Sequence, residues 1–403
     1  MSKYKNMYEY YRMQDVLPTY GGFQSRSDLE AHEQYRRRLF TEKLFLPSRL
    51  FQNARMIEFG PDSGENSLVF AQWGASCTLV EPNPKAHPAI KEYFQRYGFS
   101  HRLVSLEHAD IEGFAKHCQL LEEYDIIDAE GFIYTVRPES LWIDLFARLL
   151  NDDGLVILSY CEAFGSFIEL LSKVIHARMR RLTGMSALEA AQKLFTVKWD
   201  SIPHIRSFES WVMDVLENPF VRLSYFLEPD SLCSQMHEAG FSLYSSWPSY
   251  KDALAVYWHK KTLTPDEQIQ SQSRFVAHSR ISHIFGKQLF LSRPAPEEML
   301  WNLVRLTDSL IDEFSDETVE QLLELLAVLS HMLKFEVVYS DPRDREDACR
   351  ALESITTIMS TLRKGSIDGI VRFCNTDSAW IETWGMPNHF AVFRKSASLQ
   401  PTR

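Results

Sequence analysis

Short apolar segments alternate with longer amphipathic ones in the first part of the chain. The segments RMIEF, CTLVE, RLVSL, YDIIDA and GLVILSY begin at residues 55, 77, 102, 124 and 154, and have the length and apolar content of buried strands. Each is followed by polar or amphipathic sequence typical of a helix. This alternation predicts an α/β fold, a doubly wound and mostly parallel sheet with helices on both faces.

The alternation stops after Tyr160. From residue 166 to 182 apolar side chains recur at helical spacing, and further helical patterns follow to about residue 228. Two more strand patterns, FSLYSSW at 241 and LAVYWHKK at 254, predict the pair of strands that completes the sheet. We therefore expect a domain over 51–262 with a helical cap insertion at about 163–228.

Both flanks of this domain are expected to be mainly helical. Residues 1–50 predict an N-terminal helical lid, with a helix from Ser27 to Phe45 that Ser27 or Asp28 would cap. The polar segment TLTPDEQIQSQSR, from residue 262, predicts a linker. Residues 275–403 predict a mainly helical C-terminal domain, with aliphatic residues at bundle spacing and a late strand in HFAVF.

Composition and charge restrict the possible cell compartments and the possible classes of binding partner. No stretch approaches the roughly 18 apolar residues of a membrane span, and no secretion signal is evident. Six cysteines without CxxC spacing predict reduced thiols and a cytoplasmic location. The net charge of −11 disfavours a general nucleic-acid binder. The basic run YRRRLF at 35–40 fits a solvated helix face or an anion contact, and we favour the first.

A glycine turn follows the first predicted strand, in the segment MIEFGPDSGENS from residue 56. Such a turn lets the backbone approach a ligand closely, and the helix after it presents free N–H groups. Gly60 and Gly64 stand at relative positions 0 and 4, whereas a dinucleotide fingerprint needs glycines at 0, 2 and 5. The spacing therefore disfavours NAD as the ligand.

Acidic residues stand at three successive strand ends. Glu58 ends the first strand, Glu81 ends the second, and Asp110 follows the third. All three would face the crevice at the carboxyl edge of a parallel sheet. In such folds a carboxylate at the second position accepts both hydroxyls of a ribose, and a polar side chain at the third can hold an adenine amino group.

These segments bring out a family resemblance. IEFGPDSGENS, LVEPNP, HADIEG, DAEGFIYTVRP and LLNDDGLVILSY resemble, in order and spacing, the motifs of class I S-adenosylmethionine-dependent methyltransferases. The resemblance covers roughly residues 50–262. It implies a seven-stranded Rossmann-like methyltransferase sheet and S-adenosylmethionine as the cofactor.

The resemblance also implies a role for each motif. The first would surround the methionine part of the cofactor, the second would bind its ribose, the third would border its adenine, and the fourth would lie beside the transferred methyl group. In the same order, the matching residues are Glu58, Gly60, Pro61, Asp62 and Gly64, then Glu81 and Pro82, then Asp110 and Ile111, then Glu130, Gly131 and Tyr134.

Asp62 stands where the family has its middle glycine. An acidic side chain near a cationic sulfonium is electrostatically tolerable, so we expect reduced room and not lost binding. Asp62 also favours an alternative, a noncatalytic methyltransferase-like protein that acts as a binding or assembly module. A third interpretation is transfer of a different group from a related nucleotide.

The acceptor must be inferred from other residues. DAEG lacks the Asn/Asp-Pro-Pro-aromatic sequence of nucleic-acid amino methyltransferases, and no Pro-Cys nucleophile of the cytosine-carbon enzymes is present. With the acidic net charge, this disfavours nucleic-acid bases. We expect methylation on oxygen or nitrogen of a small molecule or a sugar-containing glycan precursor. The histidines lack ligand spacing, so no metal site is expected, and assembly into a homo-oligomer stays open.

The cap insertion supplies the candidate acceptor site, in IPHIRSFESWVMDVLENPF from residue 202. His204 is the preferred general base because its charge changes near neutral pH, and Asp214 is the second choice. Arg206, Trp211 and Asn218 are candidate substrate contacts. Trp211, Asp214 and Asn218 would share one helix face. A capped surface helix that packs Trp211 into the core explains these residues equally well.

The N-terminal tyrosines Tyr8, Tyr10, Tyr11 and Tyr20 are further candidate lid contacts. A phenol offers a ligand both an apolar face and a polar tip. Packing nevertheless explains these residues better than ligand binding.

Overall fold

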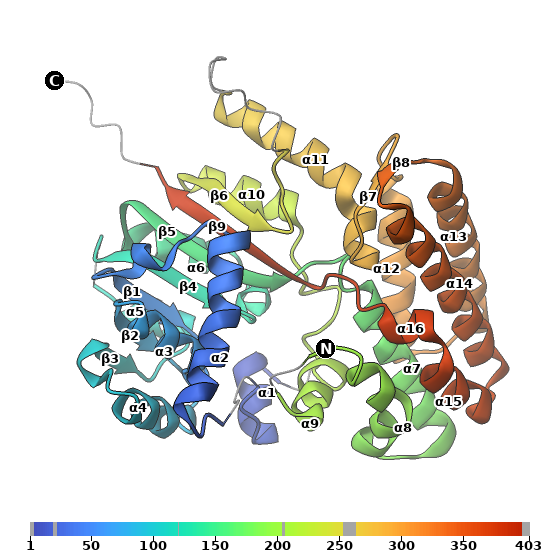
Figure 1. Cartoon of the computed structure of the whole chain (residues 1–403), viewed down its shortest axis with the longest axis horizontal. Helices are drawn as coiled ribbons and strands as arrows, with labels where there is room; N and C mark the ends of the chain where they lie inside the picture. Colours follow the sequence, from blue (N-terminus) through green and yellow to red (C-terminus); the bar gives the residue numbers. More distant parts are fainter. Residues whose placement is uncertain (1–3, 19–21, 120, 204–205, 253–262, 397–403) are drawn as a thin grey trace. The chain divides into compact units, whose positions relative to one another are not determined.

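The computed structural model describes residues 4–18, 22–119, 121–203, 206–252 and 263–396. The chain forms two compact units, each assembled from separate segments (Figure 1). Unit 1 comprises Met1–Tyr160, Pro229–Ser271 and His389–Arg403, and unit 2 comprises Cys161–Glu228 and Gln272–Asn388. Within the described ranges, no helix has both the length and the apolar character needed to cross a membrane.

Unit 1 is built on a seven-stranded sheet with the order β3-β2-β1-β4-β5-β9-β6 (Figure 1). Strands β1 to β5 pair in parallel, and β6 pairs antiparallel with β9. This confirms the mostly parallel sheet expected from the sequence. The strands are β1 Arg55–Phe59, β2 Ser76–Val80, β3 Leu103–Glu107, β4 Tyr124–Glu130, β5 Leu150–Cys161, β6 Phe241–Trp247 and β9 Asn388–Lys395.

The helices of unit 1 form two groups. In one group α3 packs against both α2 and α4, and in the other α6 packs against both α5 and α10. This is the two-sided cover that a parallel sheet needs. The helices are α1 Met7–Gln14, α2 Arg26–Arg37, η1 Arg38–Lys43, η2 Ser48–Phe51, α3 Glu65–Gln72, α4 Ala86–Arg96, η3 Ser100–Arg102, α5 Ile111–His117, η4 Ile133–Thr135, α6 Ser140–Leu149 and α10 Pro229–Glu238.

The strand that pairs with β6 comes from the end of the chain. The sequence predicted that LAVYWHKK, at 254, would complete the sheet, but residues 253–262 lie outside the described ranges. The position between β5 and β6 belongs to β9, the HFAVF segment that was expected within the C-terminal domain. Strand periodicity identifies a strand but not its partner, because pairing is decided by long-range packing.

The N-terminal segment is part of the core of unit 1. Phe40, in the π-helix η1, makes edge-to-face contacts with Phe51, Phe70 and Trp73 at ring-centroid distances of 5.5 to 5.7 Å. Its side chain is fully buried. The α-helix before η1 starts at Arg26, one residue earlier than expected, and its cap is Ser25, which forms a capping box with Asp28. The segment therefore supports the sheet as well as covering it.

Unit 2 joins the cap insertion to most of the expected C-terminal domain. Its packing pairs include α7 with α12, α12 with α13, α13 with α14 and α8 with α15. The boundaries of independently folding domains stay a prediction. The elements are α7 Phe167–Thr183, α8 Ala187–Trp199, α9 Phe208–Trp211, η5 Val212–Leu216, β7 Leu289–Leu291, α12 Glu297–Asp312, α13 Asp316–Phe335, β8 Val337–Ser340, α14 Pro342–Lys364, α15 Ile367–Thr376 and α16 Ser378–Glu382.

The expected linker is instead the start of a long helix, α11 Pro265–Phe285. Thr264 Oγ1 accepts a hydrogen bond from Glu267 N at 3.3 Å, and Glu267 Oε2 accepts one from Thr264 N at 2.7 Å. This is a capping box followed by a polar first turn. The linker prediction was wrong. It gave more weight to the lack of apolar residues than to the capping box, which marks the start of a helix.

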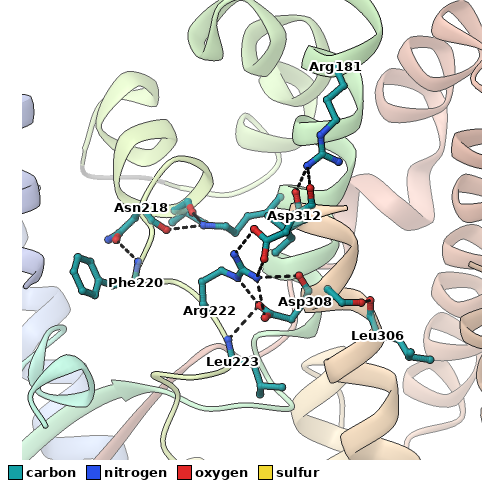
Figure 2. Close-up of polar contacts among 12 residues, drawn as sticks. Arg181, Asn218, Phe220, Arg222, Leu223, Leu306, Asp308 and Asp312 are labelled. Carbon is teal, nitrogen blue, oxygen red and sulfur yellow. Dashed lines mark hydrogen bonds and ion pairs between the residues drawn. The ribbon is translucent and has the colours of Figure 1, made fainter. Parts of the chain in front are cut away.

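Two arginines fix the C-terminal end of α12 within unit 2 (Figure 2). Arg222 donates to both Asp308 and Asp312, with N–O distances of 2.7 to 3.1 Å. Arg181, from the last turn of α7, donates to the backbone oxygens of Ile311 and Asp312. Cations at a helix C-terminus satisfy its free carbonyl groups and oppose its dipole. These contacts join the two chain segments that build the unit.

We predict that Phe40→Ala lowers the free energy of unfolding by about 3 to 5 kcal/mol, because it leaves a cavity among buried aromatic rings. Tyr35→Ala, at an exposed position on α2, serves as the matched control and should change stability by less than about 0.5 kcal/mol. Urea denaturation measures both. Equal effects of the two changes would show that the N-terminal segment is a detachable cover.

Candidate functional site

The glycine turn lies between β1 and α3, as the sequence predicted. Gly60 and Gly64 have φ values of +68° and +89°, a region that L side chains rarely adopt. A Cβ on Gly60 would lie 2.7 Å from Phe132 Cε1, and one on Gly64 would lie 3.0 Å from Ile90 Cγ1. Conformation and space therefore both require glycine at these two positions.

Asp62 takes a left-handed conformation in the same turn, with φ at 50°. Aspartate tolerates this region better than most residues. Its backbone N–H donates to Glu81 Oε2 at 3.0 Å. The residue that replaces the family's glycine thus keeps the turn conformation and connects the turn to the end of β2.

Glu81 holds the turn from the end of β2. Its Oε1 atom accepts a second backbone hydrogen bond, from Asn83 N at 2.6 Å. Burial raises the pKa of Glu81 to about 8, and the nearby Asp62 carboxylate adds to the rise, while the two hydrogen bonds oppose it. Each carboxylate oxygen has a further lone pair, so Glu81 can still accept hydrogen bonds from a ligand.

A row of carboxyl groups lies beside the turn, on β1 and β4. Glu58 and Asp128 are register partners in this parallel pair, and Glu130 follows two residues after Asp128 on the same face. Glu58 accepts a hydrogen bond from Ser67 Oγ on α3. Burial raises the pKa of Glu58 to about 7, and the neighbouring Glu130 contributes to the rise.

Arg36, on α2, is the cation that faces this row. Its two terminal nitrogens donate to the two oxygens of Glu130 at 2.6 and 2.7 Å. The guanidinium carbon lies 4.6 Å from the ring centroid of Phe40. The favoured interpretation of the basic run, a solvated helix face, is wrong for Arg36, which is buried, whereas Arg37 and Arg38 are exposed.

Tyr8 brings α1 to the glycine turn. Its hydroxyl lies 3.3 Å from the position of a Cβ on Gly60, and its ring centroid is 5.3 Å from that of Phe132. The pKa of the phenol is raised by burial and by the carboxylates of Glu81 and Asp110. The aromatic N-terminal sequence predicts Tyr8 as a candidate lid contact, with packing as the better explanation.

The third and fourth motifs reach the same edge of the sheet. Asp110 caps α5 by accepting a hydrogen bond from Gly113 N at 2.7 Å, and Ile111 is buried beside it. Gly131 N donates to the backbone oxygen of Ser159 on the neighbouring strand at 3.1 Å. Tyr134 is buried in η4. The cofactor residues expected from the motifs therefore all lie in unit 1, at or beside the carboxyl ends of β1 to β4.

The candidate acceptor residues belong to unit 2, and His204 lies outside the described ranges. Asp214 forms an ion pair with Arg206. Trp211 is buried among aromatic rings that include those of Trp199 and Phe208.

The helix face expected for these residues is not observed. The α-helix α9 ends at Trp211, the π-helix η5 follows to Leu216, and Asn218 lies beyond both. Asn218 is buried, and its side-chain oxygen accepts a hydrogen bond from Phe220 N at 2.9 Å. Trp211 and Asn218 therefore both have structural contacts, and their role toward an acceptor stays a prediction.

Comparison with known proteins identifies the family. A family model described as methyltransferase domain matches residues 31–246, and no curated protein matches the chain. Among solved structures, a Galdieria sulphuraria protein assigned as a sarcosine dimethylglycine methyltransferase is 11% identical and has a TM-score of 0.37, covering 96% of this chain and 97% of that one.

Two further solved structures are similar. The [4+2]-cyclase SpnF is 11% identical over 90% of this chain and 80% of its own, with a TM-score of 0.36. The N-methyltransferase NodS from Bradyrhizobium japonicum is 18% identical over 40% of this chain and 75% of its own, with a TM-score of 0.30. These TM-scores are low, so the family is assigned from the matching family model, which covers more than half of the residues. The chain belongs to the class I methyltransferases.

Proposed function

We propose that the chain is an S-adenosylmethionine-dependent methyltransferase that acts on oxygen or nitrogen of a small molecule or a sugar-containing precursor. The arrangement at the carboxyl ends of β1 and β2 is the main support. There Gly60 and Gly64 fix a tight turn, and Glu81 joins that turn to the second strand. A turn and a carboxylate placed in this way suit the methionine and ribose parts of the cofactor.

The bound cofactor would supply a methyl group on a cationic sulfur. The residues of unit 1 would then bind and orient it. The first-motif residues Glu58, Gly60, Pro61, Asp62 and Gly64 would surround the methionine part. Glu81 would accept the ribose hydroxyls with Pro82 beside it, and Asp110 and Ile111 would border the adenine. Glu130, Gly131 and Tyr134 would lie beside the methyl group.

The cap residues stay our proposal for the acceptor. Methyl transfer is an in-line displacement, so these residues would align the acceptor and remove its proton where required. His204 and Asp214 are the candidate bases, and Arg206, Trp211 and Asn218 the candidate contacts. Asp214 forms an ion pair with Arg206, so these two residues would act together.

A noncatalytic role is the second candidate. Asp62 in place of the family's glycine favours it, as does the approach of Tyr8 and Phe132 to Gly60. Such a protein would keep the fold and use it as a binding or assembly module. Ligand binding separates the two candidates.

We predict that S-adenosylmethionine and S-adenosylhomocysteine both bind in isothermal titration calorimetry. Glu81→Gln should weaken binding by roughly tenfold, since about 1.4 kcal/mol of hydrogen bonding to the ribose is lost. Glu107→Gln, at the exposed end of the adjacent strand β3, is the matched control and should bind normally. No binding of either ligand at millimolar concentration would refute the cofactor assignment.

We also predict that Asp214→Asn or His204→Ala lowers turnover by about 10²- to 10⁴-fold if the altered residue is the general base. Either variant should bind S-adenosylhomocysteine as the unaltered protein does. The measurement is methyl transfer to a panel of small hydroxyl and amine acceptors, with and without sugar groups. Full turnover in both variants would remove these residues from the proposed mechanism.

A further inference from the structure

The carboxyl row on β1 and β4 contains more acid than its contacts can neutralise. Glu58, Asp128 and Glu130 lie on one face, and the single cation Arg36 makes its bidentate hydrogen bonds to Glu130. Three ionised carboxylates beside one guanidinium would leave two excess negative charges in a buried region. Charges of this kind are avoided by proton uptake.

The burial and contacts of Asp128 indicate that one of these protons is bound to its side chain. Its side chain has no exposed surface, and neither oxygen has a hydrogen-bond partner as a carboxylate among the described residues. As an acid it can donate to the neighbouring Glu130, and this interaction contributes to the raised pKa of Asp128. A buried carboxylate without a donor would cost several kcal/mol, so the protonated form is the stable one.

Glu58 carries the second, more readily exchanged proton. The charged and titratable groups that face it are Asp128 and Glu130 from β4, Arg36 from α2, and Cys77 and Glu81 from β2. The α3 helix contributes the hydroxyl of Ser67, which donates to Glu58 and favours the ionised form. Because the pKa of Glu58 lies near 7, a nearby cation is enough to shift its protonation equilibrium toward the carboxylate.

We propose that Glu58, Asp128, Glu130 and Arg36 form a proton-storing cluster that responds to the charge of the bound cofactor. The sulfonium of S-adenosylmethionine displaces the Glu58 proton on binding, whereas the neutral sulfide of S-adenosylhomocysteine leaves it in place. The proton passes to solvent, and no covalent bond to the cofactor forms. This inference rests on the proposed function and adds a basis for discriminating donor from product.

The direction of the pH effect follows from the raised pKa of Glu58. Below about pH 7 the acid is protonated, and binding the sulfonium must include loss of that proton. Above about pH 7 the carboxylate is already present, so the cation binds without this cost. Affinity for S-adenosylmethionine relative to S-adenosylhomocysteine should therefore rise with pH, by at most about tenfold per pH unit for one linked proton.

Calorimetry in two buffers with different ionisation enthalpies, at pH 6 to 8, measures the protons released. We expect release with S-adenosylmethionine, and less with S-adenosylhomocysteine. Glu58→Gln should abolish the difference. Asp128→Asn replaces one neutral group by another, so it should leave the proton release close to that of the unaltered protein. Glu107→Gln is the control that should behave as the unaltered protein.

A second measurement tests the cluster without ligand. The folded-state pKa of Glu58, about 7, exceeds the value of about 4.3 expected for an unfolded chain. The native state therefore binds more protons in this window, and stability falls as pH rises from about 5 to 7. The melting temperature of the unaltered protein should fall over this range relative to that of Glu58→Gln.

Each outcome bears on a different claim. Binding of both ligands with equal proton release would overturn the inference and leave the proposed function intact. Parallel melting temperatures of the unaltered protein and Glu58→Gln across this pH range would overturn it independently of any ligand. Failure of both ligands to bind would refute the proposed function and the inference together.

Discussion

The ion pair between Arg36 and Glu130 is the contact on which the proposed site depends. It joins α2 to the last residue of β4 through two short hydrogen bonds, and both side chains are largely buried. The attraction in a buried ion pair offsets the free-energy cost of desolvating its charges only when the geometry is good. Removing one partner leaves the other charge buried and unpaired. The bidentate fork supplies that geometry. The N-terminal segment therefore sets the charge of the site in addition to enclosing it.

The same pair explains why the N-terminal segment belongs to unit 1. The Arg36 guanidinium lies over the ring of Phe40, which is fully buried against Phe70 and Trp73. The π-helical turn of η1 begins two residues after Arg36 and carries Phe40 into this cluster. Packing of aromatic rings and placement of the guanidinium are consequently one structural feature, and a change at Phe40 would disturb both.

The sequence predicted what local pattern and motif spacing determine. The five parallel strands and the glycine turn lie where expected because strand length, turn residues and strand-end acids are encoded over short stretches. The partner of β6 was missed because the strands pair across a large separation in sequence. Arg36 was missed for a similar reason. Three consecutive arginines look alike in sequence, and only the helix orientation buries the first of them.

Trp211 and Glu81 illustrate a limit on what spacing alone can assign. Both residues were singled out for chemistry, and both have contacts that stabilise the fold. Trp211 is buried and packs against the rings of Trp199 and Phe208, as the large apolar surface of an indole favours. For Glu81 the two backbone hydrogen bonds use only part of the capacity of a carboxylate. A structural role therefore leaves Glu81 able to bind a ligand, because the contacts that position its oxygens also leave lone pairs for another donor.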